Sequence, residues 1–121
     1  MPQAMVVDDS KAMRMILSRS LAEIGYEICH AGDGAEALSL LREDMSLVLV
    51  DWNMPHMSGL EFVQRMRADP KYAKVVVMMV TTETEVEQMV KALEAGANEY
   101  VMKPFTRDII ADKLRLLGLL H

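Results

Sequence analysis

Five polar residues that are suited to phosphoryl chemistry come directly after short apolar runs of the chain. Asp8 and Asp9 follow the first run, Asp51 follows another, and Thr81 and Lys103 follow two later ones. Three carboxylates held close together repel one another, so their pKa values rise unless a cation neutralises them. Mg²⁺ prefers oxygen ligands and suits that role. A carboxylate nucleophile, a divalent ion, an amine and a hydroxyl are the groups needed to transfer a phosphoryl group onto an aspartate.

Each of these residues, taken alone, also has an ordinary structural explanation. An Asp-Asp pair after a strand is often a turn and helix cap, a threonine before a helix is often a cap, and a Lys-Pro pair is often a loop. Their placement at the ends of separate strands is what favours a common site. His56, in contrast, is predicted to be a solvated loop residue because Mg²⁺ prefers oxygen ligands.

The five residues can meet only if the runs that precede them are parallel strands of one sheet. The run 46–50 is apolar and rich in β-branched residues, and a turn with Pro55 and Gly59 follows it. This pattern predicts a buried strand that ends at Asp51. Strands and helices alternate along the whole chain, which predicts an α/β fold with a doubly wound parallel sheet and helices on both faces. The carboxyl ends of its strands share one edge, where ligands bind in such folds.

The hydrophobic periodicity gives bounds for these elements. Predicted strands cover 4–7, 26–30, 46–50, 75–80 and 99–102, and predicted helices cover 11–24, 35–42, 60–68, 83–95 and 107–117. Ser10 and Thr106 are predicted N-caps. Helical spacing predicts that the core-facing residues are Met13, Ile16, Leu17, Leu21 and Ile24 in the first helix and Val86, Met89, Val90 and Leu93 in the fourth. The apolar residues 116–121 either pack on the sheet or meet a partner.

Length and composition exclude several classes of protein. A chain of 121 residues suits one domain. The net charge of -5 argues against a nucleic-acid-binding surface. The single cysteine, Cys29, excludes a disulfide framework and favours a reducing compartment. The N-terminus lacks the basic region of a secretory signal, and no apolar run is long enough to span a membrane. We therefore expect a cytoplasmic protein.

Four motifs of the chain resemble a known family. They are V-V-D-D-S at 6–10, D-W-N-M-P-H-M-S-G at 51–59, V-T-T-E at 80–83 and Y-V-M-K-P-F-T at 100–106. In order and spacing they are similar to the receiver domain of two-component response regulators, above all to CheY-like single-domain chemotaxis regulators. The resemblance covers essentially the whole chain, so residues 1–121 are interpreted as a single receiver domain. It implies a flavodoxin-like, five-stranded sheet with strand order 2-1-3-4-5.

The resemblance also implies roles for matching positions, by this chain's numbering. Asp51 would be the phosphoacceptor and Lys103 would bind the phosphoryl group, with a cis bond to Pro104. Mg²⁺ or Mn²⁺ would be held by the carboxylates of Asp9 and Asp51, by Asp8 mainly through a bound water, and by the backbone carbonyl of Asn53. Thr81 and Tyr100 would be the switch residues, and Asn53 and Glu83 would tune hydrolysis of the acyl phosphate.

The same resemblance implies partners and an output surface. A CheA-like histidine kinase would supply the phosphoryl group, and the domain would catalyse only its own phosphotransfer and dephosphorylation, so it is not expected to be an enzyme. The signal would leave through the helix 83–95, the strand 99–102 and the last helix, with Glu85, Gln88, Lys91 and Ala92 on the docking face. The protein that binds this surface would be a flagellar motor switch protein or another downstream target. A phosphatase could act on the phosphorylated form. The chain would be a monomer without nucleic-acid or membrane partners.

Three other interpretations stay open at this point. The chain could be a receiver cut from a larger regulator or hybrid kinase, or a phosphate sink. It could be a phosphohydrolase of the haloacid dehalogenase type, which also uses an aspartate in a D-x-D motif, although here Asn53 replaces the second carboxylate. It could also be an interaction module that has lost phosphorylation, which the set of Asp9, Asp51, Thr81 and Lys103 disfavours.

Overall fold

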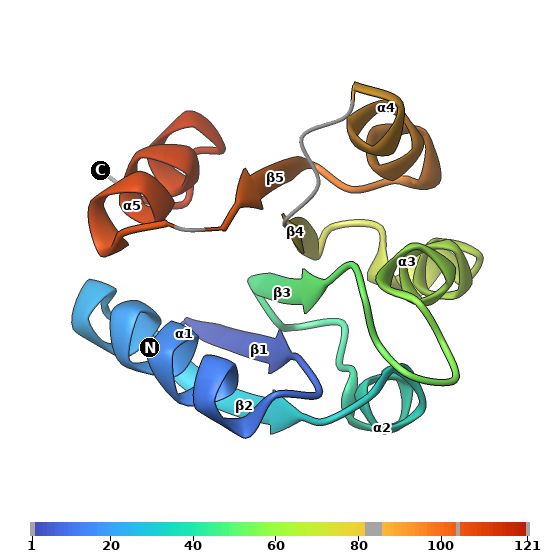
Figure 1. Cartoon of the computed structure of the whole chain (residues 1–121), viewed down its shortest axis with the longest axis horizontal. Coiled ribbons are helices and arrows are strands. Elements are labelled where there is room, and N and C mark those ends of the chain that lie inside the picture. Colours follow the sequence, from blue (N-terminus) through green and yellow to red (C-terminus); the bar gives the residue numbers. More distant parts are fainter. Residues whose placement is uncertain (1, 82–85, 104, 121) are drawn as a thin grey trace.

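Five strands and five α-helices alternate along the chain and form one three-layer arrangement (Figure 1). The computed structural model describes residues 2–81, 86–103 and 105–120. The strands are β1 (Gln3–Val7), β2 (Glu27–Ala31), β3 (Leu47–Asp51), β4 (Val76–Thr81) and β5 (Glu99–Met102). The helices are α1 (Lys11–Ile24), α2 (Gly34–Leu40), α3 (Gly59–Arg67), α4 (Val86–Ala95) and α5 (Arg107–Leu116), with a 3₁₀ helix, η1, at Pro70–Tyr72.

All strand pairs are parallel, and the strand order is β2-β1-β3-β4-β5. This confirms the predicted fold class and strand order. The register places Val7 beside Val50, Asp51 beside Val80, and Thr81 beside Met102. The chain therefore leaves β1, β3, β4 and β5 at one edge of the sheet, close to the place where the strand order reverses between β1 and β3.

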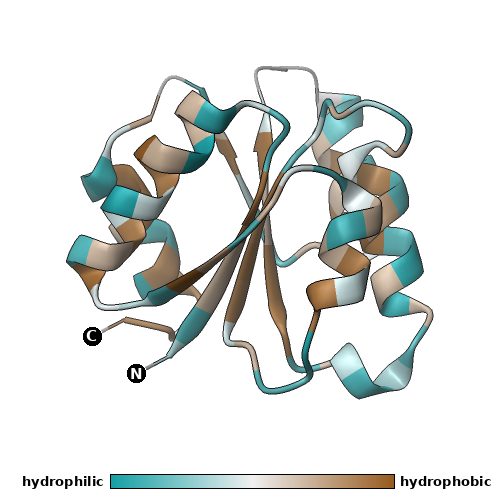
Figure 2. Ribbon diagram, turned by 90° about the horizontal axis from the view of Figure 1, so that it is seen from below, coloured by the Kyte–Doolittle hydropathy of each residue, from teal (hydrophilic) through white to brown (hydrophobic). Residues whose placement is uncertain are grey.

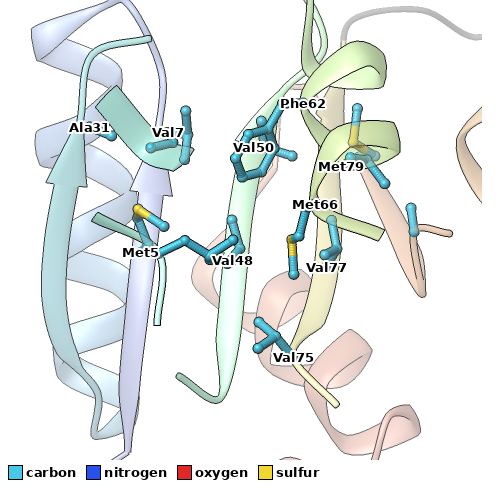
Figure 3. Packing of buried hydrophobic residues seen from close by; sticks show 14 of the residues in the cluster. Met5, Val7, Ala31, Val48, Val50, Phe62, Met66, Val75, Val77 and Met79 are labelled. Atoms are coloured by element: carbon cyan, nitrogen blue, oxygen red, sulfur yellow. The ribbon is translucent and has the colours of Figure 1, made fainter. Parts of the chain in front are cut away.

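Helices cover both faces of the sheet, as the alternation predicted. Leu17 and Leu21 of α1 and Ile110 of α5 belong to one buried cluster, whereas Phe62 and Met66 of α3 belong to the cluster on the other face, together with residues of α2 and α4. Figure 3 shows this second cluster between the strands and α3. In Figure 2 the strands are hydrophobic between helices whose outer faces are largely hydrophilic. Residues of β3 are buried along its whole length, which explains its continuous apolar run.

Local sequence explains where most helices begin. Side chains of Ser10, Asp33, Ser58 and Thr106 each accept a hydrogen bond from a backbone N–H in the first turn of α1, α2, α3 and α5. The predicted caps Ser10 and Thr106 are thus confirmed. Gly25 ends α1 with φ of 124°, a conformation that favours glycine.

Several predicted bounds shift by one or two residues. β2 starts at Glu27 rather than residue 26, because the Tyr26 N–H still donates to Leu21 O at the end of α1. α2 runs from Gly34 to Leu40 rather than over 35–42, since Leu41 is already extended with ψ of 135°. At the C-terminus, Leu117, Leu119 and Leu120 pack against the α1–α5 cluster, while Leu116 stays 79% exposed. The tail therefore packs on the fold, apart from that side chain.

Two predicted core faces are partly wrong. In α1 the side chain of Ile16 is 54% exposed. It lies about 100° around the helix from Leu17, which is buried together with Leu21 on the core face. In α4 the side chains of Val90 and Leu93 are 42% and 48% exposed.

The face of α4 that packs on the sheet carries small residues instead. Ala92 is 2% exposed and belongs to the buried cluster, and Ala95 packs against it. Small side chains allow the helix to approach the sheet closely, which turns the larger apolar side chains outward. Ala92 was therefore wrongly predicted to lie on the docking face, and Val90 and Leu93 occupy the exposed face.

Some sequence predictions fall on residues outside the described part of the chain. These are the start of the fourth helix at residues 83–85, the tuning role of Glu83, the docking role of Glu85 and the cis bond to Pro104.

Candidate functional site

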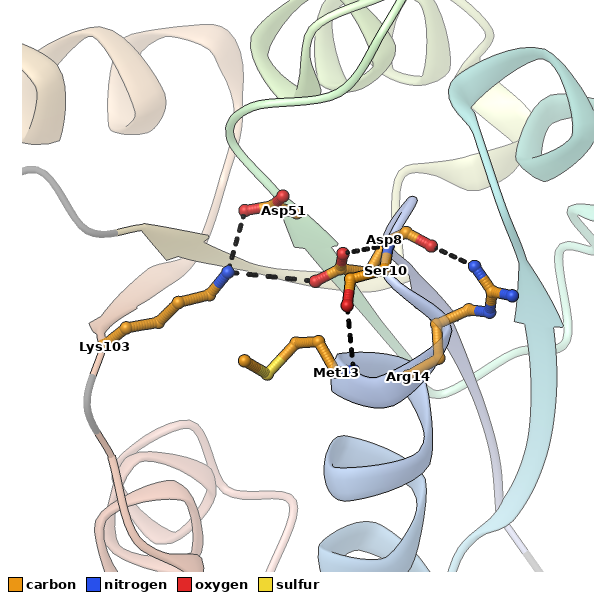
Figure 4. A network of polar contacts seen from close by, with 6 residues as sticks. All are labelled: Asp8, Ser10, Met13, Arg14, Asp51 and Lys103. Carbon is orange, nitrogen blue, oxygen red and sulfur yellow. Dashed lines mark hydrogen bonds and ion pairs between the residues drawn. The ribbon is translucent and has the colours of Figure 1, made fainter.

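The polar residues that follow the strands meet at the carboxyl edge of the sheet (Figure 4). Asp8 and Asp9 follow β1, and Asp51 is the last residue of β3. One carboxylate oxygen from each lies within 4.8 Å of the others, and Asp8 and Asp51 are buried whereas Asp9 is exposed. The Nζ atom of Lys103, just beyond β5, lies 3.4 Å from Asp51 Oδ1 and 3.9 Å from Asp8 Oδ2. The structure therefore brings together four of the predicted site residues.

Asp8 is held in place from several directions. Its Oδ1 atom accepts a hydrogen bond of 2.9 Å from the backbone N–H of Ser10, and its backbone carbonyl accepts one from Arg14 Nη1. Its Oδ2 atom is buried and has no hydrogen-bond partner among the described residues. One oxygen of this carboxylate is thus fixed by the chain, and the other lies 3.9 Å from the Lys103 ammonium without a hydrogen bond to any described residue.

Burial controls the electrostatics of the two inner carboxylates. Desolvation raises the pKa of Asp51, the nearby Asp8 carboxylate raises it further, and Lys103 partly offsets both effects. Desolvation also raises the pKa of Asp8, against the opposing effects of the Ser10 N–H and Lys103. The single ammonium group is therefore insufficient to compensate both acids, and the cluster favours an additional positive charge.

The loop after Asp51 is shaped by a glycine. A Cβ atom added at Gly59 would lie 2.3 Å from the backbone oxygen of Asp51, so any larger residue would displace one of the two segments. The Gly59 N–H donates a 3.0 Å hydrogen bond to Trp52 O, which closes the loop. Within it, the backbone N–H of Asn53 acts to lower the pKa of Asp51, against the effect of burial. The role of the Asn53 carbonyl as a metal ligand stays a prediction.

The two predicted switch residues lie on the neighbouring strands. Thr81 is 3% exposed at the end of β4, and its backbone carbonyl accepts a 2.7 Å hydrogen bond from the Lys103 N–H. Tyr100 is half-buried on β5, beside Met79 of β4, and packs against the core cluster on the α4 side. Thr81 therefore borders the acidic cluster, and Tyr100 lies farther along the sheet towards α5. His56 is exposed, with φ of 68°.

The donors of the acidic cluster fit a hard divalent cation such as Mg²⁺. All are carboxylate oxygens, one buried oxygen of Asp8 lacks a hydrogen-bond partner in the described chain, and burial already disfavours the bare negative charges. A cation held here would neutralise the charge that Lys103 leaves uncompensated. The residues present therefore support a metal-binding role.

Two residues of the site were missed at the sequence level. Arg14 binds the Asp8 carbonyl, and Ser10 supplies a backbone donor to the carboxylate as well as capping α1. A partial signal exists, since Arg14 lies in the first turns of the helix that follows Asp8. Its contact depends on how α1 leaves the sheet, which periodicity does not specify.

Comparison with known proteins gives the class of this arrangement. Residues 4–115 match the family model described as response regulator receiver domain. The chain therefore belongs to the response regulator receiver domain family, in agreement with the motifs, the strand order and the acidic edge of the sheet.

Within that family the similarity is to chemotaxis proteins. The chain is 43% identical over 113 residues to a chemotaxis protein CheY homolog of Campylobacter jejuni, which covers 91% of this chain and 87% of the relative. It is 40% identical over 116 residues to chemotaxis protein CheY1 of Helicobacter pylori, covering 93% of this chain and 94% of that one. The solved structure of the chemotaxis response regulator CheY4 of Vibrio cholerae superposes with a TM-score of 0.88 at 34% identity, over 97% of this chain and 98% of that one.

Among the described residues, each helix is either too short or too polar to cross a bilayer.

Proposed function

We propose that this chain is a phosphorylation-activated switch of a two-component chemotaxis pathway, with Asp51 as its phosphoacceptor. The observation that carries the proposal is the buried Asp51 carboxylate at the end of β3, 3.4 Å from Lys103 and within reach of two further carboxylates. The chemotaxis role is supported by the similarity to the CheY proteins. We expect it to act as a monomer in the cytoplasm.

The proposed transfer needs a nucleophile and a compensated negative charge. An oxygen of Asp51 attacks the phosphorus of a phosphohistidine on a kinase, the P–N bond breaks, and the imidazole leaves with its electron pair and takes up a proton. Lys103, whose Nζ lies 3.4 Å from Asp51 Oδ1, would bind the arriving phosphoryl oxygens. Asp8, Asp9 and Asp51, with the backbone carbonyl of Asn53, would hold Mg²⁺ or Mn²⁺. When bound, such an ion neutralises the carboxylates and the transferred oxygens.

The acyl phosphate is proposed to be hydrolysed at the same site, with Asn53 and Glu83 tuning the rate. The chain would thus act only on its own phosphoryl group, and a separate phosphatase could accelerate its loss. We expect it to have no other substrate, which separates it from a phosphohydrolase of the haloacid dehalogenase type.

The proposed output is a surface formed by α4, β5 and α5. It is supported by exposed apolar side chains on all three elements, namely Val90, Leu93, Met102 and Ile109. Exposed apolar side chains that together form a large patch mark protein interaction sites. Thr81 and Tyr100 connect this surface with Asp51 by their positions on β4 and β5. The proposed partner is a flagellar motor switch protein or another downstream target.

Intact mass spectrometry tests the phosphoacceptor directly. The protein is incubated with Mg²⁺ and a small phosphodonor, in parallel with Asp51→Asn and with a chelator control. We expect a metal-dependent mass gain of one phosphoryl group that the variant lacks. A folded wild-type protein without this gain would favour the interaction module, and turnover of an external phosphomonoester would favour the hydrolase. Equal partner affinity of both forms would favour a phosphate sink.

A further inference from the structure

A carboxylate and an ammonium group contact Tyr100, the first at its backbone N–H and the second at its aromatic ring. Glu99 Oε1 accepts a 2.9 Å hydrogen bond from the Tyr100 backbone N–H and lies 3.4 Å from Lys113 Nζ of α5. The Lys113 ammonium lies over the Tyr100 ring, 4.8 Å from its centroid. The Glu99 and Lys113 side chains are only 21% and 26% exposed, so both are held close to the protein. We call these three residues the tyrosine brace.

The brace borders a hollow that leads to the acidic site. The hollow has a volume of about 370 Å³ and is lined by Tyr100, Val101, Met102, Lys103, Ile109 and Lys113. Lys103 at one end contacts Asp51, and Lys113 at the other contacts the Tyr100 ring. A ring that turns from its present position must give up the contact with the ammonium, because that contact depends on the cation lying over the ring face.

We propose that Tyr100 has its resting orientation in this structure, and that Lys113, oriented by Glu99, is a positioning residue that stabilises this orientation and so opposes switching. This inference rests on the proposed function, since it concerns the response of Tyr100 to a phosphoryl group on Asp51. By linkage, any contact made only in the resting state weakens the binding of ligands that favour the switched state, and by the same factor. Removal of the ammonium group should therefore tighten binding of a phosphoryl mimic.

The effect is measured with beryllofluoride, a phosphoryl mimic, in the presence of Mg²⁺, using the fluorescence of Trp52 beside Asp51. Lys113→Gln should lower the half-saturating concentration about two- to five-fold, the size expected of a partly exposed cation–π contact. Glu99→Gln should give a smaller change in the same direction, because its amide can still accept from the Tyr100 N–H. Lys113→Arg should restore the wild-type value, since guanidinium also binds the ring face.

Two controls separate this role from a general effect of charge or stability. Lys71→Gln removes the same charge and the same type of contact, with Nζ 5.1 Å from the Tyr72 ring outside the brace, and should leave the midpoint unchanged. In a Tyr100→Leu background, Lys113→Gln should no longer have an effect. The inference would be overturned if Lys113→Gln left the affinity for beryllofluoride unchanged or weakened it. It would also be overturned if Lys113→Gln raised the affinity by the same factor in the Tyr100→Leu background. A wild-type protein that does not bind beryllofluoride would instead refute the proposed function and, with it, the inference.

Discussion

Two polar clusters lie at opposite ends of the sheet and differ in how well their groups are satisfied. At the carboxyl edge, Asp8 and Asp51 are buried carboxylates that share one ammonium group, and Asp8 Oδ2 lacks a hydrogen-bond partner in the described chain. At the other end, the guanidinium of Arg67 donates to Gly96 O at 3.0 Å, to Tyr72 O and Val75 O at 2.8 Å, to Ala73 O at 3.4 Å and to Asn98 Oδ1 at 3.0 Å.

The difference separates a structural cluster from a chemical one. Arg67 is desolvated, which lowers the pKa of its guanidinium, but all its nitrogens have acceptors and the contacts tie α3, η1 and the loops before β4 and β5 together. The acidic cluster is left with negative charge that the chain does not compensate. A buried group that is fully paired stabilises a fold, whereas an incompletely paired one is available to bind a ligand.

The largest expected effect is on the structural cluster. Arg67→Met would leave several carbonyl oxygens without their donor, and we expect a loss of about 3 kcal/mol in the free energy of unfolding. For a domain of this size that lowers Tm by roughly 10 °C. Thermal unfolding followed by circular dichroism measures it. Phosphorylation of the folded variant should be retained, because Arg67 lies at the opposite end of the sheet from Asp51.

Arg65→Met is the matched control for this variant. Arg65 lies on the same helix, its side chain is 58% exposed, and it pairs with Glu61 at 3.7 Å. Exposed pairs of this kind contribute about 0.5 kcal/mol or less. A drop in Tm for Arg67→Met that is no larger than the drop for Arg65→Met would remove the contrast between the two clusters.

At the acidic cluster we expect a substitution to raise the free energy of unfolding rather than lower it. Asp51→Asn removes one of two buried carboxylates that repel each other and leaves Lys103 to compensate Asp8. Without divalent ions we expect the variant to be more stable by about 1 kcal/mol, or about 4 °C in Tm. Phosphorylation should be abolished. Added Mg²⁺ should raise the Tm of the wild type more than that of the variant, since it binds the native carboxylates.

Asp44→Asn serves as the control for loss of a carboxylate as such. The Asp44 side chain is 73% exposed and pairs with Arg42 at 3.3 Å, so its removal should change stability by less than about 0.5 kcal/mol. A lower Tm for Asp51→Asn than for the wild type would show that the acidic cluster stabilises the fold, contrary to this interpretation.

The contrast also explains which parts of the molecule the sequence could predict. Asp8, Asp51 and Lys103 were found because each follows an apolar strand, and parallel strands end at one edge. Arg67 was missed because an arginine in the last turn of a helix ordinarily interacts with solvent and the helix end. Its acceptors come from residues 72–98, which only tertiary structure brings together.

The face of α4 was mispredicted for a related reason. Hydrophobic spacing identifies an apolar stripe, but it does not tell whether the large or the small members of the helix pack inward. Here Ala92 is buried, and Leu93 remains exposed. The depth at which a helix approaches the sheet depends on the neighbouring elements, so local pattern alone was insufficient.

The smallest expected effect is a pH dependence of stability, which should be present for the acidic cluster and absent for the Arg67 cluster. Burial raises the pKa of Asp51 and Asp8 in the native protein above the ordinary carboxyl value of about 4. As pH rises from the ordinary carboxyl pKa to the raised native pKa, the unfolded chain releases its protons before the native protein does. The contribution of these carboxyls to stability is therefore fully present below the ordinary pKa, and it is lost as pH rises through the raised native pKa. Acidification from neutral pH, without divalent ions, should therefore reduce the stability advantage of Asp51→Asn over the wild type.

The difference in Tm between the two proteins, measured from pH 7.5 to pH 5, reports the titration of Asp51 together with its effect on Asp8, because titrating groups outside the acidic cluster are common to both. The same comparison between Arg67→Met and the wild type should be flat, since a guanidinium stays protonated throughout. An advantage of Asp51→Asn that grows on acidification would mean that the native pKa of Asp51 is lowered rather than raised. Lys103 would then outweigh burial, and the acidic cluster would be as well compensated as the Arg67 cluster.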